Sequence, residues 1–202
     1  MPNEASELGR MKGSTVGAFF AWYEREIAAG KVREAVLSLA PEDAARFDLD
    51  KHAMGVLASH WYDAAPLHQM LDYVFGETPE PVLEDVTQRA GTAVAEEMRT
   101  GVYKILFNWF MTPGRYAKVV SRIWRLNYDS GRVETEVLAP NRHRGTVHDW
   151  AGHHGVLCRI NVAIKAEIYR AMGCRGVEIE SRYCVDNGDD ACGSIIRWDE
   201  AT

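Results

Sequence analysis

A chain of 202 residues, 47% of them hydrophobic and 26% charged, has the length and composition of one ordinary globular domain and not those of a disordered protein. Its formal net charge of −6 argues against nonspecific binding to nucleic acid or to an anionic lipid surface, because such binding depends on basic patches. No segment is apolar over the length of a membrane span, and the polar, acidic residues 1–10 lack the pattern of an export signal, so we expect a cytoplasmic location.

The N-terminal half of the chain is predicted to be helical. Apolar side chains share one helical face from Val16 to Ile27, with Ser14 or Thr15 as the N-cap and Gly30 at the end. Similar patterns recur along the rest of this half, separated by short loops. They predict further helices over residues 32–39, 42–47, 53–61, 67–74 and 82–111.

The period of the pattern changes after Pro113-Gly114. Residues 123–128 and 132–138 are predicted strands, because the Asp129-Ser130-Gly131 sequence between them is typical of a hairpin turn. An apolar stripe over residues 157–171 then predicts a long helix. The remaining expectations are a loop over 140–145, a half-buried strand over 177–182, a turn over 186–189 and a last strand over 194–198.

Together these elements predict an α+β fold. A helical N-terminal half is followed by a four-stranded antiparallel sheet in the order β-β-α-β-β, with helices packed on it. We expect a single domain over residues 1–202. In that domain residues 1–10 are disordered, residues 11–112 form the mainly helical part and residues 113–202 form the α/β part.

Three of the four cysteines are predicted to meet at one place. Cys184 and Cys192 stand on the two sides of a hairpin mouth, and Cys158 lies on the preceding helix. Together with Glu180, which would share a strand face with Cys184, they would suit a tetrahedral zinc ion. The alternative is that the cysteines are core thiols, since free cysteine is among the most buried residue types. Both interpretations remain open from the residues alone.

The segment over residues 155–198 resembles the 4-vinyl reductase-like domain. The signature of that domain is a helix, a strand that ends in a cysteine, a Gly-Asp turn and a second cysteine, which here are Cys184, Gly188-Asp189 and Cys192. The domain shares its fold with TRAPP-type trafficking subunits and, more distantly, with haem nitric-oxide-binding sensors. The chain as a whole, and residues 91–133 above all, more loosely resembles a paralogous family of myxobacteria with undefined function.

The first resemblance implies a dimeric bacterial sensor of phenols or other aromatics, in which three cysteines and one glutamate hold zinc. The separations between Cys158, Cys184 and Cys192 are similar to those of such sensors. This chain departs from them at one ligand, because the family's glutamate lies three residues before the hairpin cysteine, where Ser181 stands here. Glu180 would need a β-bulge to take its place.

Two further groups of side chains bear on ligand binding. The histidines at 148, 153 and 154 precede a predicted helix and are interpreted as exposed; none has a convincing proximal setting for haem iron, so we expect no haem. Aromatic side chains could line an apolar ligand pocket, although aromatics at helical spacing more often belong to a plain core. The candidate pocket residues are Tyr103, Phe107, Trp109, Trp124 and Trp150.

The sequence favours binding over catalysis. It contains no nucleophile elbow, no phosphate-binding glycine loop and no His-Glu-x-x-His motif, so we do not expect an enzyme. We expect a small-molecule sensor or ligand-binding module that forms a homodimer, binds an apolar or aromatic molecule and signals through a downstream protein partner. The alternatives are an assembly scaffold of TRAPP-like fold, and a tetrapyrrole-related enzyme or haem sensor.

Overall fold

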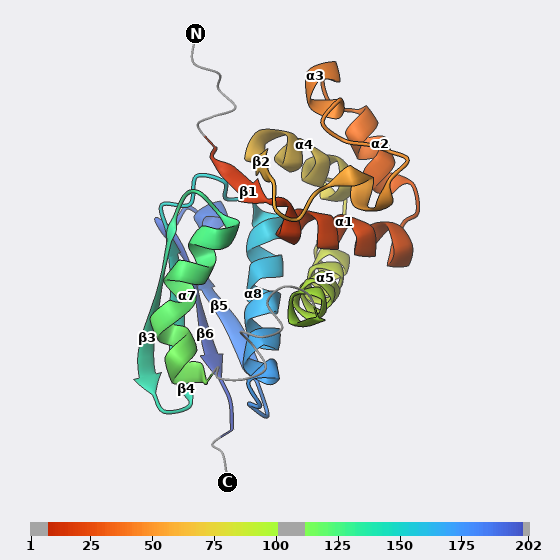
Figure 1. Cartoon of the computed structure of the whole chain (residues 1–202). Coiled ribbons are helices and arrows are strands. Elements are labelled where there is room, and N and C mark those ends of the chain that lie inside the picture. The colour runs from red at the N-terminus through yellow and green to blue at the C-terminus, as the bar shows by residue number, and fades with distance from the viewer. Residues whose placement is uncertain (1–7, 101–111, 200–202) are drawn as a thin grey trace.

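The N-terminal half begins with a short strand that pairs with the middle of that half. The computed structural model describes residues 8–100 and 112–199. In it β1 (Arg10–Lys12) runs antiparallel to β2 (Trp61–Asp63), so the residues between the two strands form one closed unit. The helices of this half are α1 (Gly13–Glu26), α2 (Lys31–Leu37), α3 (Pro41–Ala44), the 3-10 helix η2 (His52–Gly55), α4 (Ala64–Phe75) and α5 (Glu80–Thr100) (Figure 1).

Backbone pairing, and not a side-chain cap, starts α1. The N–H group of Gly13 donates to the carbonyl of His60 at 2.9 Å, which satisfies one of the free donors at the helix start. The N-cap expected at Ser14 or Thr15 is therefore wrong, because both residues lie inside the first turn. The helix expected over residues 53–61 is also wrong, since this segment supplies the carbonyl that starts α1 and the first residue of β2.

A four-stranded antiparallel sheet with strand order β3-β4-β6-β5 forms the C-terminal half. Its strands are β3 (Arg132–Ala139), β4 (Arg142–His148), β5 (Glu178–Tyr183) and β6 (Ala191–Arg197). The helix α7 (Pro113–Asn127) precedes the sheet, and α8 (Gly155–Ala171) connects β4 to β5. The predicted α+β fold, with its helical N-terminal half and its β-β-α-β-β sheet, is confirmed.

The two faces of the sheet have different chemistry. Side chains that point toward α7 and α8 include the apolar Val133 and Val147 and the small Ser194. The opposite face carries exposed ion pairs, of which Arg144 with Glu136 at 3.0 Å is one. Exposed ion pairs contribute only about 0–1 kcal/mol each to stability. The packing of the other face against the helices therefore holds the sheet in place.

The C-terminal half differs from the prediction at two turns. Residues 123–128, expected as a strand, are the end of α7 and its C-cap. Pro113 starts the helix, and Thr112 caps it by accepting from the N–H of Arg115 at 3.3 Å. The buried face of the helix then continues to Asn127. Residues 140–145, expected as a loop, contain only a short turn, and β4 already begins at Arg142.

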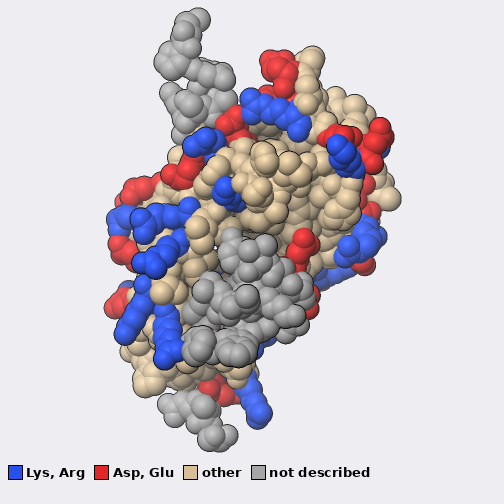
Figure 2. Space-filling view, viewed as in Figure 1, with Lys and Arg blue, Asp and Glu red and all other residues tan. Residues whose placement is uncertain are grey.

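Charged side chains are spread over the surface, and a group of lysines and arginines follows α7 (Figure 2). The exposed residues of this basic face are Arg115, Lys118, Arg122 and Arg125. No helix among the described residues has the length and apolar character required to cross a membrane.

The helices α5 and α8 approach each other closely at Gly91. A Cβ atom added to Gly91 of α5 would stand 2.3 Å from the Cβ of Ala163 and 3.0 Å from the backbone nitrogen of Ile164 on α8. Both Gly91 and Ala163 are buried. Only a glycine therefore allows the two backbones to approach this closely.

We expect Gly91→Ala to lower the free energy of unfolding by about 1–3 kcal/mol, because the added methyl group would push α5 away from α8. Alanine has the higher helix propensity by about 1 kcal/mol, so a loss would have to come from packing. Gly114→Ala in α7 is the control, since its added Cβ would meet no heavy atom of the described residues within 4 Å, apart from the adjoining residues and the backbone of α7 itself. Urea unfolding of both variants measures the effect, and equal stability of Gly91→Ala and wild type would contradict the contact.

Candidate functional site

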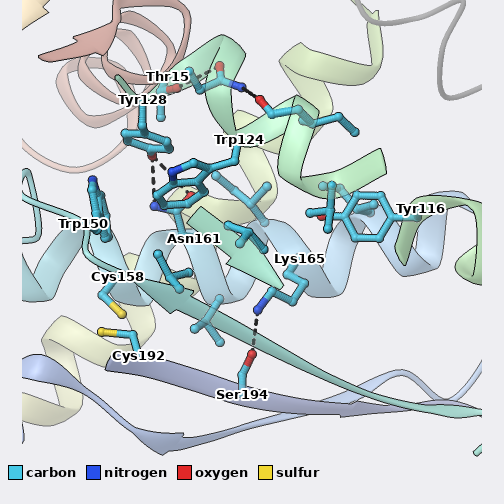
Figure 3. Close-up of a pocket in the computed structure, with 18 of the residues that line it drawn as sticks. Thr15, Tyr116, Trp124, Tyr128, Trp150, Cys158, Asn161, Lys165, Cys192 and Ser194 are labelled. Atoms are coloured by element: carbon cyan, nitrogen blue, oxygen red, sulfur yellow. Dashed lines mark hydrogen bonds between the residues drawn. The ribbon is translucent and has the colours of Figure 1, made fainter. Parts of the chain in front are cut away.

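A cavity of about 100 Å³ lies between α7, α8 and the covered face of the sheet (Figure 3). Thr15 of α1 and Met98 of α5 also line it, so four helices and the sheet meet there. Most of the lining is apolar, as in binding sites for small molecules. Its polar groups belong to Thr15, Tyr116, Asn127, Tyr128, Asn161, Lys165 and Ser194, together with the thiols of Cys158 and Cys192.

Three aromatic side chains form one wall of the cavity. Trp124 stacks on Tyr128 with ring centroids 4.2 Å apart, and Trp150 meets both rings at 5.1 Å. Hydrogen bonds fix the rings, because the indole N–H of Trp124 donates to the carbonyl of Ser130 and the amide of Asn161 donates to the Tyr128 hydroxyl. Burial also raises the pKa of Tyr128 to about 12, so its hydroxyl stays neutral. The wall is thus formed before any ligand binds.

Among the described residues that line the cavity, Lys165 carries the positive charge. Lys165 reaches from α8 toward the sheet, and its ammonium group donates to the hydroxyl of Ser194 at 2.7 Å (Figure 3). Gly145 leaves room for the ammonium group, since an added Cβ there would stand 2.8 Å from the Lys165 nitrogen. Lys165 is partly buried and lines the cavity, and its burial lowers the pKa of the ammonium group to about 8.

The structure locates two of the five residues predicted to bind a ligand. Trp124 and Trp150 both line the cavity. Tyr103, Phe107 and Trp109 lie outside the described residues.

The sequence analysis missed the polar residues of the cavity, although α8 carries a signal for them. Cys158, Asn161 and Lys165 recur at spacings of three and four residues, which places them on one helical face next to the apolar stripe. Polar side chains in that position indicate a helix that faces a cavity.

A cluster of sulfur and imidazole groups lies at the start of α8. One ligand atom each from His153, Cys158, Cys184 and Cys192 falls within 4.8 Å of the others. The Cys184 sulfur is 3.3 Å from that of Cys192, 3.7 Å from that of Cys158 and 3.5 Å from the Nε2 atom of His153. The other ring nitrogen of His153 lies 3.4 Å from a carboxylate oxygen of Asp186. Three thiols and one imidazole are a donor set that divalent transition metals accept.

Glu180 does not belong to this cluster, which corrects the predicted ligand set. A register shift between Ser181 and Tyr183 breaks the alternation of β5, so Glu180 and Cys184 do not share a face. Glu180 instead pairs with Arg182 at 2.8 Å on the exposed face of the sheet. His153 stands in its place, and sequence spacing gave no reason to join it to the cysteines.

The other histidines near α8 have separate roles. His154 caps α8, because its ring nitrogen accepts from the N–H group of Val156 at 3.2 Å. His148 lies near Glu134 on the exposed face of the sheet. The group at 148, 153 and 154 is therefore not a single ligand set.

Comparison with solved structures identifies the fold. No family model and no curated protein matches the chain. It is similar to an Fe(II) unliganded H-NOX protein from K. algicida, with a TM-score of 0.69, 13% identity and coverage of 95% of this chain and 98% of that one. An H-NOX protein from S. oneidensis in the Fe(II)NO ligation state gives 0.67 and 13%, over 94% of this chain and 100% of that one. The chain therefore has the fold of haem nitric-oxide-binding proteins, and the 4-vinyl reductase-like and TRAPP-like labels are not supported.

The sequence analysis predicted that the chain binds no haem and that its metal is zinc. These comparisons contradict that prediction. That expectation rested on the setting of histidines in the sequence. A solved protein of the same fold carries Fe(II). Two other solved structures of this fold come from studies of how the protein distorts its haem or porphyrin. The fold is thus one that holds haem elsewhere, which histidine spacing could not reveal.

The described lining of the cavity does not match a haem with an imidazole ligand. All seven histidines lie in the described residues, and none of them lines the cavity. The cavity volume of about 100 Å³ is also close to that of a cavity of roughly 150 Å³ that accommodates benzene, and it is too small for a porphyrin.

The lowered pKa of Lys165 predicts that the stability of the chain depends on pH. The pKa of Lys165 is about 8 in the folded state and 10.5 ordinarily, so the folded chain binds fewer protons between these values. Stability of the wild type should therefore rise as the pH increases through this window. We expect Lys165→Met to raise the free energy of unfolding at pH 7, by at most on the order of 3 kcal/mol, and the gain to shrink toward pH 10.

Urea unfolding between pH 7 and pH 10 tests this expectation. Lys118→Met is the matched control, because Lys118 is exposed on the outer face of α7. A Lys165→Met variant that is less stable than wild type at pH 7, or whose gain does not change with pH, would show that the ammonium group is not desolvated.

Proposed function

We propose that this chain is a sensor domain that binds a small, mainly apolar molecule in the cavity between α7, α8 and the sheet. The observation that carries the proposal is a preformed cavity in which apolar walls surround a few fixed polar groups. Such a combination is the usual form of a small-molecule site. The aromatic wall of Trp124, Tyr128 and Trp150 gives a planar ligand a surface to stack on.

The size of the cavity sets the size of the ligand. At about 100 Å³ it is somewhat smaller than an apolar cavity of roughly 150 Å³ that accepts benzene. A single ring or a short branched chain is therefore the largest body that enters without movement of the helices.

The position of the cavity supports sensing. Its lining comes from α1, α5, α7, α8 and the sheet, so an occupant contacts both halves of the chain. A ligand that binds one arrangement of these elements more tightly than another shifts their population, which a protein partner can detect. The homodimer, the downstream partner and the cytoplasmic location remain predictions from the sequence.

A haem-based gas sensor is the second candidate, and the similarity in fold to H-NOX proteins favours it. An absorption spectrum of protein produced with a haem precursor distinguishes the two candidates. A Soret band at one equivalent would favour the haem sensor and would require a cavity different from the one described.

Tryptophan fluorescence tests the apolar-ligand proposal, because Trp124 and Trp150 line the cavity. We expect toluene or benzyl alcohol to change the emission saturably and to raise the melting temperature. Val147→Phe places a larger side chain in the cavity and should abolish both effects, whereas Val137→Phe, on a residue 56% exposed on β3, should preserve them. Neither compound binding to the wild type, or equal binding to Val147→Phe, would reject the proposal.

The thiol cluster supports a separate metal-site proposal. We propose that His153, Cys158, Cys184 and Cys192 bind one divalent transition-metal ion that joins the start of α8 to the β5–β6 turn. The Asp186 carboxylate behind the His153 ring supports this arrangement, because metal-bound histidines commonly donate their second N–H to a carboxylate. Four protein ligands would leave no open position, so such a site would be structural.

Cobalt(II) is a visible probe of this site. We expect one equivalent of Co²⁺ to produce thiolate-to-metal absorption and to raise the melting temperature of metal-free protein. Cys184→Ser should lose both effects, because its sulfur contacts the other three ligands. Cys174→Ser should keep them, since Cys174 lies outside the cluster. Unchanged binding by Cys184→Ser would reject the assignment.

A further inference from the structure

The cavity contains a charged group that an apolar ligand alone does not explain. Lys165 lies on the face of α8 that also carries Asn161, and its ammonium group points to Ser194 on β6 (Figure 3). A lysine at this point costs stability, and apolar residues of similar length could fill the same space. Its presence in an apolar cavity therefore calls for a function.

The ammonium group has hydrogen-bonding capacity to spare. It carries three N–H donors, and among the described residues only the Ser194 hydroxyl accepts from it. No aspartate or glutamate is among the described residues that line the cavity, and no ion pair joins Lys165 to a described carboxylate. Other lysines do have such partners, as Lys51 has in Asp48 at 2.8 Å. A positive charge in the cavity thus lacks a negative partner from the described part of the chain.

We propose that Lys165 selects the ligand, and that the ligand is a small monocarboxylate with a compact apolar body. The inference rests on the proposed function and adds a charge to the ligand. One carboxylate oxygen accepts from the Lys165 ammonium group, and the other accepts from the Ser194 hydroxyl, which can donate its own proton while it accepts from Lys165. The apolar body lies against Val120, Ile123 and the Trp124 ring.

The surface charge is consistent with an anionic ligand. The outer face of α7, the helix that covers the cavity, carries Arg115, Lys118, Arg122 and Arg125 (Figure 2). A positive field over the elements that form a site raises the local concentration of anions and their rate of association. The net charge of −6 makes this local positive region a contrast with the chain as a whole.

Benzoate and benzyl alcohol test the inference, because they share a ring and differ in the carboxylate. Isothermal titration calorimetry at pH 7 should show that the wild type prefers benzoate by about tenfold to hundredfold, the discrimination expected of a charge-assisted hydrogen bond. Lys165→Met, and Lys165→Gln, which keeps a donor for Ser194 without the charge, should lose this preference and still bind benzyl alcohol. Lys118→Met should keep the preference, since Lys118 is exposed and outside the cavity.

Each alternative result has a distinct meaning. Equal affinity of the wild type for the two compounds, or an undiminished preference in Lys165→Met and Lys165→Gln, would overturn the role of Lys165 and leave the apolar-ligand proposal standing. A loss in Lys118→Met as large as in Lys165→Met would overturn it as well, because surface charge would then explain the preference. Binding of neither compound would reject both the inference and the proposed function.

Discussion

The contact between Gly91 and Ala163 sets the position of α8, and the site depends on that position. Because a side chain at residue 91 would collide with α8, the two helices approach backbone to backbone and α8 cannot rotate freely about its axis. With one face of α8 held against α5, the opposite face must meet the sheet and α7. That face carries Cys158, Asn161 and Lys165, so a packing constraint at a distance decides which polar groups enter the cavity.

The cavity shows how the fold accommodates groups that oppose its stability. Apolar burial along α7, α8 and the covered face of the sheet supplies the driving force, and the aromatic wall adds ring contacts between Trp124, Tyr128 and Trp150. Against this stand a desolvated ammonium group and three thiols brought close together. Destabilising groups of this kind occur in proteins where the surrounding structure fixes their position, and they are concentrated at functional sites.

Periodicity predicted the class of fold, because the helices and most of the strands bury one face and repeat accordingly. It failed where two signals competed. Asp129-Ser130-Gly131 resembles a hairpin turn, yet Pro113 and an apolar face that runs to Trp124 make the preceding residues a helix. At the site, Cys158, Cys184 and Cys192 were grouped correctly by the turn between two strands. Glu180 was misplaced because a bulge in β5 reverses the facing of side chains, and His153 was missed because its approach depends on three-dimensional packing alone.

The strand order has a consequence for how the chain reaches this structure during synthesis. β6, the last strand described, lies between β4 and β5, and β5 pairs with no other described strand. Until residues 191–197 leave the ribosome, β5 has no partner and the half of the sheet beneath Lys165 is missing. The cavity therefore cannot close around a ligand before these residues have emerged. Because β4 and β6 are separated by the whole of α8, their pairing also requires closure of a long loop, which slows the final step of folding.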